Sequence, residues 1–155
     1  YAHTGESLAA MLEALREHHP GARLICVFGC GGDRDRGKRG PMGRAAIAAD
    51  LAVLTTDNSR SEDPVAIAAD VVAGLPPGAC VHWDAGTVEP PPGAHLVVQS
   101  DRAAAIRLAQ RLAGRDGVVV VAGKGHETTQ LIQGRSEAWD DRAFVRSLGA
   151  HGDGR

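Results

Sequence analysis

The sequence predicts an α/β fold in which an open, mostly parallel sheet carries helices on both faces. Helix-like and strand-like segments alternate along the 155 residues, as successive strand–helix units require. The strand-like segments are short apolar runs, of which GVVVVA at 117–122 is the clearest, and such runs are typical of strands buried on both faces. Apolar residues make up 43% of the chain but aromatic residues only 3%, so we expect an aliphatic core. Together these observations favour a Rossmann-like arrangement.

Five helices are expected from the spacing of apolar residues and from residues that begin or end helices. In the first helix apolar residues recur every three or four positions, and Thr4 or Ser7 can cap its start. Pro64 suits the first position of the third helix, and Ser100 or Asp101 can cap the fourth. The expected ranges are 6–19, 42–51, 64–73, 101–113 and 140–148.

Strands are expected between these helices, at 23–28, 52–56, 95–99 and 117–122, with one further short strand around Val81 in the Gly- and Pro-rich stretch 74–95. The segment 128–133 is either a closing strand or one arm of a hairpin. We expect a single domain over 1–149 and a frayed tail over 150–155. Because the chain begins with Tyr1 and not with Met, we expect it to be a domain of a longer protein.

The charge pattern argues against nucleic-acid and membrane partners. The net charge is −2 and the pI about 6.4, with no basic face that could follow a phosphate backbone. The sequence contains no run of 18 apolar residues and no signal-peptide pattern. The cysteines Cys26, Cys30 and Cys80 lack the spacing of a metal site. We therefore expect reduced thiols, a cytoplasmic location and no bound metal in this chain.

Three polar loops follow predicted strands, at 29–40, 57–63 and 123–128. In open parallel sheets ligands bind beyond the carboxyl ends of the strands, where these loops would meet. The first loop is rich in glycine and charge, the second begins Asp-Asn-Ser-Arg, and the third begins Gly-Lys-Gly-His-Glu. The sequence therefore predicts a ligand site at this edge of the sheet.

The first loop matches two nucleotide-binding motifs only in part. The stretch 32–39 resembles a P-loop, but Arg39 stands where a Ser or Thr must ligate magnesium. The stretch 29–34 resembles a dinucleotide fingerprint, but Arg34 stands where the third glycine is required. Two other interpretations stay open: a structural loop whose Asp and Arg side chains pair with one another, or a loop that directs an arginine at a ligand.

The side chains of Arg34, Asn58, Arg60 and Glu127 would share this edge of the sheet. Arginine forms bidentate pairs with carboxylates, whereas a glutamate suits an ammonium group. Gly123 lets the backbone approach a ligand closely. Because a free amino acid carries a carboxylate and an ammonium close together, this combination indicates a pocket for a zwitterion.

Three strings along the chain resemble the Mur ligases, which build the peptide of the bacterial cell-wall precursor. The opening Tyr-Ala-His-Thr is similar to the family's segment between its central and C-terminal domains, and DDR at 140–142 matches the start of its last helix. The resemblance covers nearly all of 1–149 and implies the fold of the family's C-terminal domain. The three strings are VFGCGGDRDRGKRGPMG (27–43), TTDNSRSEDP (55–64) and GKGHETTQ (123–130).

The resemblance implies an ATP- and Mg2+-dependent ligase that adds meso-diaminopimelate to UDP-MurNAc-L-Ala-D-Glu in peptidoglycan synthesis. In this family the carboxylate of the growing peptide becomes an acyl phosphate, which the incoming amine attacks. The family's P-loop, carbamylated lysine and UDP-sugar-binding segment belong to its first two domains, which this chain does not contain. No catalytic residue is therefore expected here, and the isolated domain should bind its amino acid weakly without ligating it.

The resemblance also implies roles for single residues. Arg60 matches the arginine of the family's Asp-Asn-Pro-Arg signature, which binds the distal carboxylate that lysine lacks. His3 and Lys38 match residues on the nucleotide side of the cleft. The other predicted contacts with diaminopimelate are Arg34, Asp57, Asn58, Ser59, Gly123 and Glu127.

The chain departs from the family pattern at three places. Ser59 replaces the signature proline, and Gly5 replaces a proline after His-Thr. The stretch 76–95 differs from the corresponding stretch of the Mur ligases. Two alternatives therefore stay open: an amino-acid-binding module without catalysis, and a related ligase that adds lysine or ornithine or acts outside the cell wall. Arg60 argues against a lysine-adding enzyme.

Overall fold

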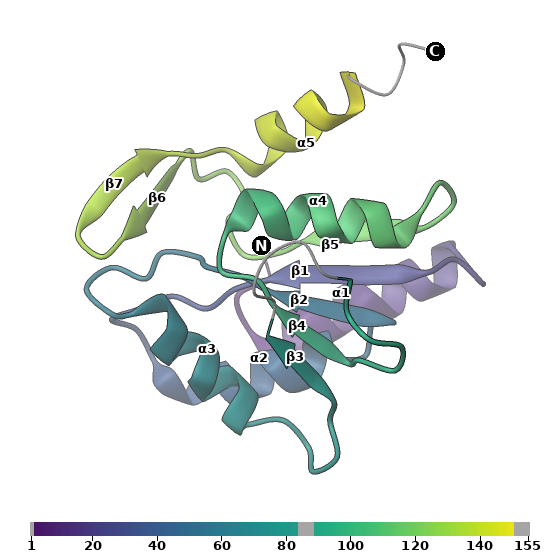
Figure 1. Ribbon diagram of the computed structural model, residues 1–155, viewed down its shortest axis with the longest axis horizontal. Coiled ribbons are helices and arrows are strands. Elements are labelled where there is room, and N and C mark those ends of the chain that lie inside the picture. The colour runs from purple at the N-terminus through teal and green to yellow at the C-terminus, as the bar shows by residue number, and fades with distance from the viewer. Residues whose placement is uncertain (1, 84–88, 151–155) are drawn as a thin grey trace.

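Five parallel strands form the central sheet of the protein, in a computed structural model that describes residues 2–83 and 89–150. The order is β3-β4-β2-β1-β5, and every neighbouring pair is parallel. This architecture, visible in Figure 1, confirms the predicted α/β fold class. The strands are β1 (Leu24–Phe28), β2 (Leu51–Leu54), β3 (Val81–Trp83), β4 (Leu96–Val98) and β5 (Val118–Val121).

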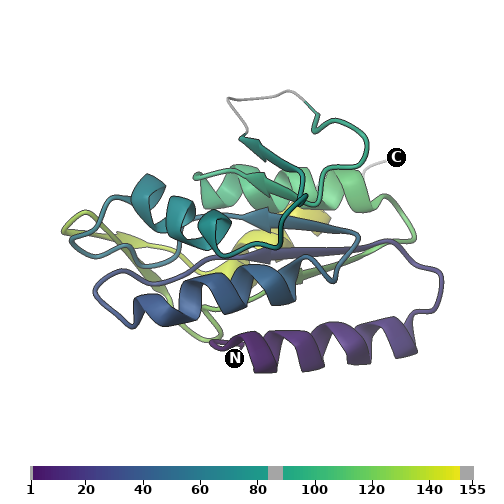
Figure 2. The same ribbon diagram turned by 90° about the horizontal axis from the view of Figure 1, so that it is seen from below.

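Helices cover both faces of the sheet, as Figures 1 and 2 show. Along β1 the side chains alternate between two apolar clusters: Cys26 and Phe28 belong to one, and Ile25 and Val27 to the other. The first cluster joins the sheet to α1, α2 and α3, and the second joins it to α4 and α5. The helices are α1 (Gly5–His18), α2 (Arg39–Ala46), α3 (Pro64–Ala73), α4 (Arg102–Ala113) and α5 (Asp141–Ala150).

The predicted helix starts are largely confirmed. The Thr4 hydroxyl accepts a hydrogen bond from the backbone N–H of Ser7, and Asp101 caps α4 in the same way. Pro64 occupies the first turn of α3, after a cap by Asp63. The alternatives Ser7 and Ser100 are not the caps. The last helix continues to Ala150, and the rest of the predicted tail lies outside the described residues.

The predicted position of the second helix is wrong by about one turn. The helix was expected over 42–51, but α2 begins at Arg39 after a 3-10 turn and ends at Ala46. Pro41 is tolerated because the first turn of a helix has no partners for its backbone N–H groups. After α2 the chain turns, and the Asp50 carboxylate accepts a hydrogen bond from the N–H of Leu24. The next strand ends at Leu54, so that Thr55 and Thr56 belong to the following loop.

A separate two-stranded antiparallel hairpin follows the central sheet. It consists of β6 (Thr129–Ile132) and β7 (Arg135–Ala138), joined by Gln133 and Gly134. Both turn residues have positive φ, at 48° and 81°, as a two-residue turn that continues the strand twist requires. From the sequence, 128–133 is expected to be either a closing strand or one arm of a hairpin. The second arm, β7, was not predicted.

Among the described residues, no helix is long and apolar enough to cross a membrane.

Candidate functional site

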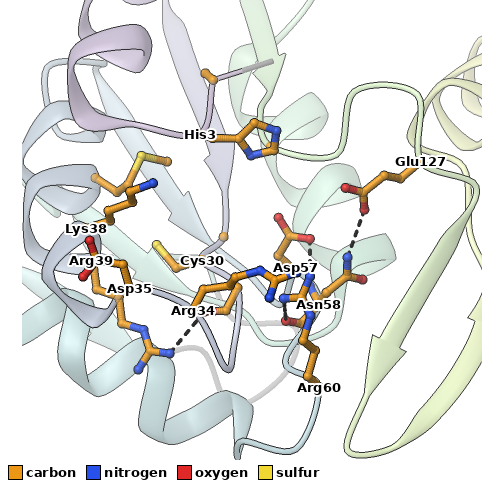
Figure 3. A pocket seen from close by; sticks show the side chains of 15 residues that line it. His3, Cys30, Arg34, Asp35, Lys38, Arg39, Asp57, Asn58, Arg60 and Glu127 are labelled. Carbon is orange, nitrogen blue, oxygen red and sulfur yellow. Dashed lines mark hydrogen bonds between the residues drawn. The ribbon is translucent and has the colours of Figure 1, made fainter.

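A cavity of about 470 Å³ lies at the carboxyl edge of the sheet, where the three predicted loops meet. The strand order reverses at β1, because β2 and β4 lie on one side of it and β5 on the other. A crevice is expected at such a reversal. The loops after β1, β2 and β5 all contribute to the cavity walls, together with the segment before α1. Figure 3 shows their side chains from close by.

Most of the predicted site residues line this one cavity. Arg34, Asp57, Asn58, Arg60, Gly123 and Glu127 are among its lining residues, and so are His3 and Lys38. Ser59 is the exception. Its side chain is fully buried, and its hydroxyl accepts a hydrogen bond from the backbone N–H of Gln133 in the hairpin turn. Ser59 therefore contacts the hairpin, and we do not include it among the ligand contacts.

The amide of Asn58 is held from both ends. Its Oδ1 accepts hydrogen bonds from the backbone N–H of Leu131, at 2.9 Å, and from Nζ of Lys124, at 3.0 Å. Its Nδ2 donates to Oε2 of Glu127, at 2.9 Å. The second and third predicted loops are thus joined through one side chain, with the hairpin behind it.

Lys124 is a site residue that the sequence analysis missed. Its side chain is fully buried and lies 3.4 Å from an oxygen of Asp57 and 3.5 Å from an oxygen of Glu127. It also donates to the carbonyl of Thr129, at 3.0 Å. The sequence signal that could have pointed to Lys124 is the pair of glycines beside it, Gly123 and Gly125. Gly123 has φ of 109°, and a Cβ there would lie 2.9 Å from Oδ2 of Asp57, so the chain turns sharply and closely at this point.

Arg60 joins the first two loops. Its Nη1 donates to the carbonyls of Gly32, at 2.9 Å, and of Asn58, at 3.3 Å. The backbones are also in direct contact, because a Cβ on Gly32 would lie only 1.8 Å from the carbonyl oxygen of Ser59. Arg60 has φ of 53°, which is uncommon for a residue with a side chain.

The charged side chains of the first loop pair with residues further along the chain. Arg39 is buried and contacts the carboxylates of Glu62 and Asp70, at 2.9 and 2.8 Å. Asp33 accepts hydrogen bonds from Ser61, which lower the pKa of the Asp33 carboxyl. Among the described residues, the close ion pairs of this loop thus go to Glu62 and Asp70 and not to the loop's own aspartates. Arg34 is exposed at the cavity wall, and its charge contributes to the lowered pKa of Asp33.

Cys30 lines the same cavity but is a poor nucleophile. Burial raises the pKa of its thiol to about 12, so that the thiolate is scarce near neutral pH. Cys26 and Cys80 are free thiols as well. Among the described residues no three His, Cys, Asp or Glu side chains come together in a way that could hold a metal ion.

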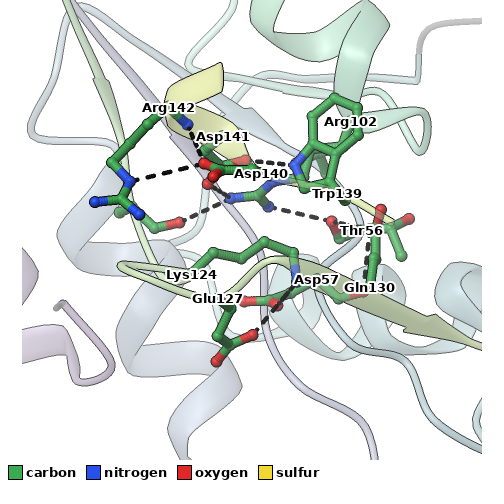
Figure 4. Close-up of polar contacts among 12 residues, drawn as sticks. Thr56, Asp57, Arg102, Lys124, Glu127, Gln130, Trp139, Asp140, Asp141 and Arg142 are labelled. Carbon is green, nitrogen blue, oxygen red and sulfur yellow. Dashed lines mark hydrogen bonds and ion pairs between the residues drawn. The ribbon is translucent and has the colours of Figure 1, made fainter. Parts of the chain in front are cut away.

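A second buried arginine, also missed by the sequence analysis, supports the loops from behind. Arg102 donates hydrogen bonds to the carbonyls of Thr56 and Ala122, at 3.2 and 3.3 Å, and to the carboxylate of Asp141, at 2.8 Å. Figure 4 shows it close to Thr56 and Asp141. Burial alone would raise the pKa of the Asp141 carboxyl, but the hydrogen bonds and charge of Arg102 outweigh burial and lower it. Trp139 donates a further hydrogen bond to Asp141. Arg102 thus holds the ends of β2 and β5 against α5.

The described residues do not form a complete nucleotide site. In a P-loop the backbone N–H groups surround a phosphate, but here the N–H of Gly37 donates to the carboxylate of Asp35, at 2.8 Å. The partial P-loop is therefore not one in structure. His3 and Lys38, the two residues expected on the nucleotide side, also line the cavity.

Comparison with known proteins agrees with this arrangement. A family model described as "Mur ligase, glutamate ligase domain" matches residues 1–125. The UDP-N-acetylmuramoyl-L-alanyl-D-glutamate–2,6-diaminopimelate ligase of Trichormus variabilis is 47% identical over 148 residues, which are 95% of this chain and 27% of that protein. The ligase of the same name from Coxiella burnetii is 50% identical over 135 residues, 85% of this chain and 24% of that protein.

A solved structure gives the same result. The structure of a UDP-N-acetylmuramoyl-L-alanyl-D-glutamate–2,6-diaminopimelate ligase superposes with a TM-score of 0.79 at 40% sequence identity. The match covers 98% of this chain and 28% of that chain. The chain thus spans roughly a quarter of the length of the relatives it matches. Both its sequence and its fold agree with these ligases, and the chain belongs to the Mur ligase family.

Proposed function

We propose that this domain binds meso-diaminopimelate as the acceptor amino acid of a peptidoglycan-precursor ligase. The observation that carries the proposal is the meeting of Arg34 and Arg60 with Glu127 in one cavity of about 470 Å³. Meso-diaminopimelate has a carboxylate and an ammonium at each end. Two arginines and a glutamate supply the opposite charges for such a molecule.

The geometry of Arg60 suits a carboxylate partner. Its Nη1 is held by two backbone carbonyls, which fixes the plane of the guanidinium. None of the hydrogen bonds among the described residues uses its Nε or Nη2, which form one edge of the fork that binds carboxylates. A fixed fork loses little conformational freedom when the ligand binds. Lysine, which has no distal carboxylate, would leave this edge without a partner.

Glu127 suits the ammonium end. Its Oε2 is engaged by Asn58 and approached by Lys124, while no described residue donates a hydrogen bond to its Oε1. The side chain of Glu127 is about two-fifths exposed and lines the cavity, so a ligand there can reach it. We therefore assign Oε1 of Glu127 to the ammonium and Gly123 to close backbone contact.

The reaction itself would require the rest of a longer protein. We propose that this domain presents the amine of diaminopimelate to a carboxylate of UDP-MurNAc-L-Ala-D-Glu that other domains bind and activate with ATP and Mg2+. Amide formation then follows by attack of the amine on an acyl phosphate. The isolated domain is expected to bind the amino acid weakly and to ligate nothing. The cytoplasm, which keeps thiols such as the three free cysteines reduced, is the proposed location.

The test compares two substrates in the full-length ligase that carries this domain. Arg60→Ala is expected to lower kcat/KM for meso-diaminopimelate, which corresponds to a loss of transition-state stabilisation on the order of 2 kcal/mol. This is the low end for truncating a charged pair, because the cavity is open to water. Any residual use or inhibition by lysine should change far less. Arg16→Ala, which removes an exposed ion pair on α1, is the matched control and should change neither.

The alternatives give different results in the same experiment. A lysine-adding ligase would turn over lysine in the wild type, and equal losses for both amino acids in Arg60→Ala would contradict the assignment of Arg60. A binding module without catalysis would bind the amino acid in calorimetry but show no amide formation with ATP and the nucleotide-linked dipeptide.

A further inference from the structure

We infer that Lys124 is a positioning residue for amino-acid recognition, acting through Asn58 and Glu127. The inference rests on the proposed function, because it concerns the same cavity. Lys124 has no exposed side-chain surface, so it cannot itself contact a ligand. Its Nζ faces four oxygens, from Asn58, Thr129, Asp57 and Glu127. Figure 4 shows its side chain extending toward Asp57 and Glu127.

The first effect of Lys124 is on the orientation of the Asn58 amide. The two ends of an amide differ, because its oxygen only accepts and its nitrogen only donates hydrogen bonds. Lys124 and the N–H of Leu131 are both donors, and both face Oδ1. Rotating the amide by half a turn would place its NH2 group against two donors. The amide is therefore fixed with Nδ2 toward Glu127.

The second effect is on Glu127. Asn58 Nδ2 lies 2.9 Å from Oε2 and Lys124 Nζ lies 3.5 Å from it, so this one oxygen is held by a donor and a nearby positive charge. Holding Oε2 leaves Oε1 as the oxygen directed to a ligand ammonium. Lys124 also offsets the mutual repulsion of the carboxylates of Asp57 and Glu127, which are the nearest negative charges to its ammonium. The glutamate is thus oriented before the ligand arrives, which reduces the entropy lost on binding.

The variant Lys124→Met tests this role, since it keeps most of the length of the side chain and removes the donor and the charge. In the full-length ligase, we expect KM for meso-diaminopimelate to rise by about tenfold, the effect typical of losing a hydrogen bond to a charged group. KM for ATP and for the UDP-linked dipeptide should stay within about twofold, because Lys124 contacts Asn58, Asp57 and Glu127 and not the residues expected on the nucleotide side. Lys124→Gln, which keeps a donor for Oδ1 of Asn58, should give a smaller rise.

A merely structural role is excluded by a matched control and a double variant. Leu108→Ala truncates a buried side chain in the apolar cluster between α4 and the sheet. It should lower the unfolding temperature without changing KM for the amino acid. In an Asn58→Ala background, Lys124→Met should raise KM for the amino acid much less than in the wild type, because the residue through which it acts is gone.

The outcomes separate this inference from the proposed function. If the wild type uses meso-diaminopimelate but Lys124→Met leaves its KM unchanged, or raises the KM values for all three substrates together, the positioning role is overturned. If Lys124→Met does not fold, the Lys124→Gln variant decides by the same criterion. A wild type that does not use meso-diaminopimelate overturns the proposed function, and the inference with it.

Discussion

The two walls of the cavity are built in different ways. One wall, formed by 57–60 and 123–127, is held by buried polar groups, and Ser59 and Lys124 have no exposed surface at all. The other wall carries Arg34, Asp35 and Lys38, which are exposed. We call these the buried wall and the exposed wall. The difference indicates that the buried wall fixes the geometry for one end of the ligand, while the exposed wall can adjust to the other end.

The hairpin covers the buried wall from behind. Arg60 pairs with β6 through the hydrogen bond from its N–H to the carbonyl of Leu131, at 3.1 Å, and its carbonyl accepts from Gly134, at 3.0 Å. Gln130 adds a buried hydrogen bond to the carbonyl of Thr56. The exposed wall has no such cover among the described residues.

The largest expected effect follows from removing the support of the buried wall. Arg102→Met should lower the free energy of unfolding by about 3–5 kcal/mol, because the buried carboxylate of Asp141 loses its ion pair and two backbone carbonyls lose a hydrogen bond. Denaturant titration of the domain measures this. Arg16→Met, at an exposed ion pair, should cost at most about 1 kcal/mol. If the two variants lose similar amounts of unfolding free energy, the buried ion pair does not stabilise the domain more than the exposed one, and the comparison fails.

A smaller effect on stability, but a clear one on binding, is expected at the exposed wall. Arg34→Ala should change the free energy of unfolding by no more than about 0.5 kcal/mol, since the side chain is exposed. Calorimetry should nevertheless show about tenfold weaker binding of meso-diaminopimelate, because a charged hydrogen bond is lost. Unchanged binding would mean that Arg34 serves another purpose than holding a carboxylate.

Much of the fold could be predicted because its signals are local. Short apolar runs and capping residues such as Thr4 and Asp101 act within a few positions of themselves. The second helix was misplaced because Arg39, which begins it, is held by Glu62 and Asp70, and pairs so distant in sequence leave no local pattern. The strand β7 was missed because its four residues are all exposed and carry no apolar alternation.

The candidate site could be predicted where a side chain faces the ligand, and not where it acts from behind. Arg34, Arg60 and Glu127 were found from charge and loop position, and all three line the cavity. Lys124 and Arg102 were not found, because a lysine or arginine is ordinarily exposed and only tertiary packing buries it. The same packing placed Ser59 under the hairpin and away from the cavity.

A crystal structure of the ligase with meso-diaminopimelate tests the central claim most directly. We predict one carboxylate within hydrogen-bonding distance of the Arg60 fork, an ammonium at Oε1 of Glu127, and an unchanged Asn58 amide between Glu127 and Lys124. The exposed wall, and Arg34 in particular, should move more than the buried wall on binding. A ligand that contacts neither Arg60 nor Glu127, or that lies outside this cavity, would contradict the account.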